Sequence, residues 1–147
     1  CDLSVMRLRL MTLLVLVACA SPTTPENDLA YYRTLWESQR LTDYRFDVSK
    51  VCYCQFVGDV RVTVINGVIT GVTEIASEVA RDPDGYPTID GFFDLVQDAY
   101  DRDAYEVQVE FDPDRGYPTR IWIDYVQMMA DDEVDFTILG DVTALEG

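Results

Sequence analysis

The chain has 147 residues, of which 48% are hydrophobic and 12% aromatic, so it is long and apolar enough for one domain with a packed core. Its 27 acidic side chains outnumber the 11 basic ones, and the net charge of −16 excludes nucleic acids and anionic bilayer surfaces as charge-held partners. The sequence contains no histidine, which excludes Ser-His-Asp, Cys-His and His-Glu-X-X-His catalysis.

Residues 1–18 are predicted to be a signal peptide with a short upstream extension. The basic segment Met6-Arg7-Leu8-Arg9 precedes the apolar run Leu10 to Val17, which is too short for a permanent membrane span. We expect Met6 to be the initiator, which makes residues 1–5 the extension.

The apolar run ends in Leu16-Val17-Ala18-Cys19, which resembles the lipobox of bacterial lipoproteins. The resemblance implies cleavage before Cys19, lipidation of that cysteine, and an exported protein that is lipid-anchored to the cell envelope. The alternative is an ordinary buried cysteine after an apolar helix. Ala20 stands where an aspartate would resemble an inner-membrane retention signal, which favours the outer membrane if the host has two membranes.

Residues 19–27 are rich in Pro, Ser and Thr, and we expect them to tether the domain, residues 28–147, close to the membrane. Apolar side chains at helical spacing predict that the domain opens with a helix over Asp28 to Arg40. Thr23 or Asn27 is the expected N-cap of this helix.

Three strands are predicted next. Apolar and polar side chains alternate from Tyr44 onward, which is typical of a half-buried strand. The second and third strands, residues 60–65 and 68–75, meet at Asn66-Gly67, the strongest short signal for a two-residue hairpin.

A charged loop then leads to a second helix with Thr88 as its N-cap and an apolar face that begins at Ile89. Three more strands are expected to begin at Tyr105, Thr119 and Glu133. Short turns between consecutive strands favour antiparallel pairing. The predicted fold class is therefore α+β, an antiparallel sheet with two helices on one face, in the order α-βββ-α-βββ.

Several short motifs occur in a fixed order along this domain, among them Cys52-Tyr53-Cys54, Asn66-Gly67-Val68, Phe111-Asp112-Pro113 and Gly116-Tyr117-Pro118. In these motifs the chain resembles a family of bacterial lipoproteins known only as a domain of unknown function. The resemblance covers nearly all of the chain after the signal peptide and supports the domain extent and the localisation. It implies no activity and no functional residues.

Cys52 and Cys54 are the only cysteines of the expected domain, and a pair of cysteines in an exported protein favours a disulfide. Two positions apart on a strand, their Cα atoms would lie ~6.5 to 7 Å apart, so a disulfide needs a bulge or bend. The alternatives are a two-thiolate site for Cu(I) or a redox pair, with Met128 and Met129 as possible neighbours, and free thiols.

Two carboxylate pairs, Asp82 with Asp84 and Asp112 with Asp114, resemble fragments of a calcium loop but lack its full spacing and closing glutamate. Turns in which an aspartate side chain accepts from nearby backbone amides are the simpler interpretation. A glycosidase-like carboxylate pair would also need a cleft.

Tyr86 and Tyr117, each followed by proline, are candidates for an exposed aromatic contact patch. The alternative, that they close the core with their hydroxyls at the surface, is favoured.

These observations predict a non-catalytic binding or envelope-assembly module that presents an acidic sheet face or loop edge to a protein, peptide or cation. The chain has no phosphate-binding glycine loop and a single lysine, Lys50, so nucleotides are not expected as ligands. No cofactor is expected. The alternative functions are copper, calcium or redox handling through the cysteines or acidic loops, and a hydrolase built on carboxylates.

Overall fold

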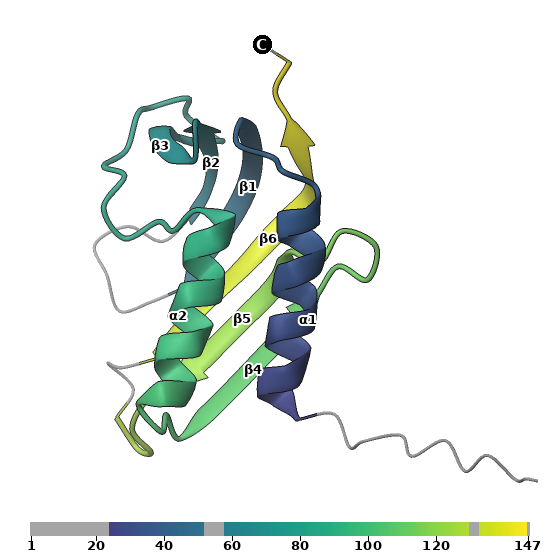
Figure 1. The fold of residues 1–147 in the computed structure, drawn as a ribbon. Coiled ribbons are helices and arrows are strands. Elements are labelled where there is room, and N and C mark those ends of the chain that lie inside the picture. The colour runs from purple at the N-terminus through teal and green to yellow at the C-terminus, as the bar shows by residue number, and fades with distance from the viewer. Residues whose placement is uncertain (1–23, 52–57, 130–132, 147) are drawn as a thin grey trace, which may run out of the picture.

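A computed structural model describes residues 24–51, 58–129 and 133–146 (Figure 1). Its elements are, in chain order, α1 (Pro25–Ser38), β1 (Tyr44–Val51), β2 (Gly58–Ile65), β3 (Val68–Glu74), α2 (Ile89–Asp101), β4 (Glu106–Phe111), β5 (Pro118–Asp124) and β6 (Glu133–Ala144). The six strands form one antiparallel sheet in the order β3-β2-β1-β6-β5-β4. The predicted α+β class with an antiparallel sheet is confirmed. Among the residues described, no helix is long and apolar enough to cross a membrane.

Helix α1 begins three residues earlier than predicted. Thr24, rather than Thr23 or Asn27, is the N-cap, and its hydroxyl accepts a hydrogen bond from the Asn27 backbone N–H at 3.3 Å. Pro25 follows at the start of the helix, where its missing N–H costs nothing. The apolar periodicity begins only at Leu29 because the first turn is solvent-facing, so the pattern alone placed the start too late.

The Asn66-Gly67 hairpin between β2 and β3 forms as predicted. Both turn residues have positive φ, 50° and 73°, which is the conformation that this dipeptide favours in a two-residue hairpin. The turn is hydrogen-bonded to the segment that connects α1 to β1. The Gly67 N–H donates to Thr42 O at 2.9 Å, and the Asn66 N–H donates to Asp43 Oδ1 at 2.6 Å.

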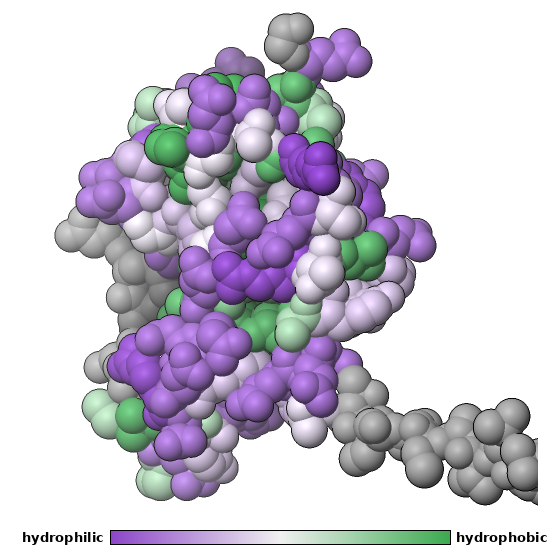
Figure 2. Space-filling model, viewed as in Figure 1, coloured by the Kyte–Doolittle hydropathy of each residue, from purple (hydrophilic) through white to green (hydrophobic). Residues whose placement is uncertain are grey.

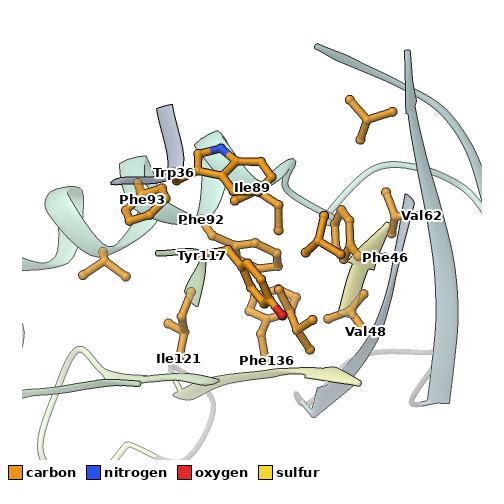
Figure 3. Close-up of a cluster of buried hydrophobic side chains, with 14 of the residues drawn as sticks. Trp36, Phe46, Val48, Val62, Ile89, Phe92, Phe93, Tyr117, Ile121 and Phe136 are labelled. Atoms are coloured by element: carbon orange, nitrogen blue, oxygen red, sulfur yellow. The ribbon is translucent and has the colours of Figure 1, made fainter. Parts of the chain in front are cut away.

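The core lies between the helices and the sheet, and a cluster of aromatic rings is packed among its more numerous aliphatic side chains (Figure 3). Trp36 of α1 meets Tyr44 of β1 edge to face, with ring centroids 5.4 Å apart. Phe92 of α2 makes the same kind of contact with Phe46 and Phe136. Offset and edge-to-face ring pairs add about 0.5–1.5 kcal/mol each beyond the burial of their area, so these contacts fix the helices to the sheet.

Tyr44 brings a hydroxyl into this aromatic cluster. The Ile89 backbone N–H, at the start of α2, donates to the Tyr44 hydroxyl oxygen at 3.1 Å. Burial raises the pKa of Tyr44 to about 12, because the anion would lose its hydration. The neutral phenol therefore links the first strand to the second helix over the whole physiological pH range.

The loop before β5 is held against α1 through Gly116. Its φ is +83°, and a Cβ atom there would lie 2.5 Å from Tyr32 O and 2.9 Å from Trp36 N. Arg115, beside it, donates from Nε to Gln39 Oε1 at 3.0 Å. The Gly-Tyr-Pro motif is thus a packing device, in which glycine lets the loop approach the helix backbone.

We predict that Gly116→Ala lowers the free energy of unfolding by about 2 kcal/mol or more beyond the loss caused by Gly67→Ala. Both positions have positive φ and share the backbone strain of an alanine, about 1–2 kcal/mol. Only Gly116 adds overpacking against backbone atoms, whereas a Cβ at Gly67 meets nothing within 4 Å. Urea denaturation of both variants measures the difference, and equal losses would contradict the close approach to α1.

Candidate functional site

A groove of about 630 Å³ lies where α1 and α2 approach the edge strand β4. This volume is within the range of ligand-binding clefts. The residues that line it come from three elements separated by up to 86 positions in sequence: Pro25, Asp28, Tyr32, Tyr100, Val107, Gln108, Val109, Glu110 and Phe111. Figure 2 shows that hydrophilic side chains dominate the surface around the two helices, with a smaller hydrophobic area exposed between them.

The walls of the groove are apolar and aromatic. Tyr32 of α1 stacks on Phe111 of β4 with ring centroids 4.4 Å apart and planes 11° apart, which fixes the helix beside the strand. Val107, Val109 and Phe111 are each only partly buried although they project to the groove side of β4. These side chains therefore retain apolar surface that a bound molecule could cover.

The rim of the groove is acidic. Asp28 and Glu110 line it, and no lysine or arginine is among the described residues that do so. Burial raises the pKa of Tyr100 above its ordinary value, and the negative charges of Glu26 and Asp28 raise it further. Asp28 of α1 and Glu110 of β4 thus lie where a cation on a ligand would be attracted.

The lipidation and thiol residues predicted from the sequence, Cys19, Cys52 and Cys54, lie outside the described residues, and their roles stay predictions. Met128 is 96% exposed and Met129 51% exposed.

The two predicted carboxylate pairs lie in separate turns. Asp82 Oδ1 accepts from the Asp84 N–H at 3.0 Å, and Asp112 Oδ1 accepts from the N–H groups of Asp114 and Arg115 at 3.0 and 2.7 Å. These are the aspartate turns of the simpler interpretation. Within the described ranges, no group of three potential metal ligands comes together.

The two predicted contact tyrosines occupy different environments. Tyr117 is 1% exposed, and its ring centroid lies 6.2 Å from that of Trp36. It therefore belongs to the core and offers no exposed contact. Tyr86 is half-buried beneath the Lys50 ammonium, which lies 5.4 Å from its ring and donates to Gly85 O at 3.0 Å. Both motifs therefore fasten loops, Tyr117 follows the favoured core interpretation, and the two tyrosines do not form an exposed aromatic patch.

The groove was not anticipated because its residues looked like ordinary core positions. The sequence shows the aromatic stripe of α1 and the Val107/Val109 alternation, and both patterns also predict burial. The available signal for an edge was the pair of glutamates, Glu106 and Glu110, on the polar face of this strand. Charged side chains are typical of a strand at an exposed sheet edge.

The fold and the groove together define an α+β protein whose single sheet offers an acidic cleft at one edge. Residues 28–141 match the sequence model of the family of unknown function DUF6174, and the chain belongs to that family. No curated protein and no solved structure matches the chain. The expected membership in a domain family of unknown function is thereby confirmed.

We predict that Asp28→Asn lowers the pKa of Tyr100, because the substitution removes a negative charge that opposes formation of the tyrosinate. Asp59→Asn removes the same charge from exposed β2, on the far side of the sheet order, and is expected to leave that pKa unchanged. NMR titration of the Tyr100 ring, assigned with Tyr100→Phe, measures both. Equal shifts in the two variants would show that net charge, rather than the groove, raises this pKa.

Proposed function

We propose that this protein is a non-catalytic, lipid-anchored binding module of the bacterial cell envelope, which captures a cationic partner in the groove beside β4. The observation that carries the proposal is the combination of apolar walls with an acidic rim in one groove. Recognition sites commonly pair apolar surface, which supplies binding energy, with a few polar groups that select the ligand.

The charge of the partner follows from the rim. Asp28 and Glu110 face the groove without a lysine or arginine among its described lining residues. The net charge of −16 adds a long-range field of the same sign. A basic partner would be steered toward the molecule by this field and oriented at the rim.

The anchor would place the groove near the membrane. Cys19 lies six positions before Pro25, which lines the groove, and six residues span at most about 20 Å when extended. A partner bound there would lie within that distance of the lipid attachment. Segments of other envelope proteins are therefore the proposed class of ligand.

We also infer that α1 and α2 share one face of the sheet. Tyr44 and Phe46 are two positions apart on β1 and so point to the same face. Trp36 of α1 contacts the first and Phe92 of α2 contacts the second. In Figure 1 both helices run in front of the strands, which agrees with this inference.

We predict that the full chain in detergent binds a short fluorescent peptide of alternating leucine and lysine, and that added salt weakens the binding. Asp28→Asn and Glu110→Gln should each weaken the affinity about two- to five-fold, the usual strength of an exposed charge pair. Fluorescence anisotropy measures these affinities.

The matched controls are Asp59→Asn and Glu78→Gln, which remove equal charge from exposed positions outside the groove. They should leave the affinity nearly unchanged, and a peptide with glutamate in place of lysine should not bind. Absence of binding by the lysine peptide, or equal losses in groove and control variants, would refute the proposed site.

The anchor has its own test. The full chain expressed in a bacterium with a clickable fatty acid should be labelled and recovered in the membrane fraction. Cys19→Ala should abolish both the label and the membrane association, because no acyl chain could then be attached. Cys52→Ala should retain both. Labelling that persists in Cys19→Ala would show that the cysteine of the lipobox is not the acceptor.

A further inference from the structure

The strand β4 is an edge whose outer side faces the groove. Among the residues that the structure describes, it is the last strand of the sheet and pairs with β5 alone. Tyr105, just before it, directs its N–H toward Tyr125 O. Because N–H and C=O directions alternate along an antiparallel strand, Val107 and Val109 bond to β5, whereas Glu106, Gln108 and Glu110 direct their backbone groups to the free edge.

The opposite edge of the sheet differs. Residues 79–81 run along β3, where the Glu74 N–H donates to Val79 O at 2.9 Å and the Arg81 N–H donates to Val72 O at 2.8 Å. Part of the β3 edge is therefore occupied by the chain itself. The β4 edge instead borders the groove, which leaves room for another strand.

We propose that the ligand of the groove is an extended peptide that adds to β4 as a seventh strand and alternates apolar with basic residues. The proposal rests on the proposed function and specifies its ligand. Strand addition supplies affinity through main-chain hydrogen bonds and specificity through alternate side chains.

The two faces of β4 determine the alternation. Side chains of an added strand on the groove side would meet Tyr32, Tyr100 and Phe111, so apolar residues belong there. Those on the other face would lie beside the exposed Glu106 and beside Glu110, which borders the groove from that face and has Arg120 as its neighbour on β5. Lysine or arginine therefore belongs there, nearest Glu106. The half-buried Val107 and Val109 would then be covered from their open side.

A second copy of the chain is a poor occupant of the same edge. Antiparallel pairing of two β4 strands about Gln108 would set Glu106 of each copy opposite Glu110 of the other. Like charges directly opposite each other on neighbouring strands are destabilising, and both chains carry a net charge of −16. A basic strand relieves the same repulsion.

Backbone N-methylation of the leucine–lysine peptide tests this mode of binding. One peptide carries N-methyl groups on its lysines and the other carries the same number on its leucines, so that charge and composition are matched. In antiparallel addition the lysine N–H groups point to β4, and their methylation should lower the affinity for the full chain at least about ten-fold. Methylation of the leucines should have little effect.

Amide hydrogen exchange gives a second measurement. Binding of the unmethylated peptide should slow exchange at Gln108 and Glu110, while Val107 and Val109 are already protected by β5. If methylation of the leucines, rather than of the lysines, lowered the affinity, the peptide would add parallel to β4, and this result would also support the site. Equal binding of both methylated peptides without protection would overturn strand addition while leaving groove binding intact. Failure of the unmethylated peptide to bind would overturn the proposed function itself.

Discussion

The antiparallel pairing of β1 with β6 is the constraint on which the rest of the structure depends. It joins strands about ninety residues apart in register, with Val48 opposite Ile138 and Lys50 opposite Phe136. Because β6 occupies the free side of β1, its hairpin partner β5 and then β4 must extend the sheet outward. The position of β4 at the edge, and hence the groove between it and α1, follows from this one pairing.

The arrangement of charge follows a similar logic. Arginines of the described residues form ion pairs with carboxylates away from the groove, for example Arg33 with Asp94 and Arg61 with Asp47. Arg120, the neighbour of Glu110 on β5, likewise pairs with Asp135. Such exposed pairs contribute little to stability individually. Their larger effect is to neutralise carboxylates elsewhere, so that the acidic character of the groove rim at Asp28 and Glu110 stands out.

Local signals predicted much of this fold. The Asn66-Gly67 turn and the Thr88 N-cap, which accepts from the Gly91 N–H at 3.0 Å, are dictated by backbone chemistry within a few residues. Strand order is different, because it depends on which distant strands bury each other's side chains. The groove could not be predicted for the same reason. Asp28, Tyr100 and Val109 come to line one groove only when β6 has paired with β1 and β4 lies at the sheet edge.

The charges on the edge strand β4 bear on which extended chains could pair with it. An uncovered β edge invites pairing with any extended chain, and charged side chains are a common protection. On β4 the protecting charges are all negative, since Glu106 and Glu110 would repel an acidic strand, including that of a second copy. A strand protected by one sign of charge remains open to partners of the opposite sign. Under the proposed strand addition, the charges that disfavour pairing with a second copy would also select a basic ligand.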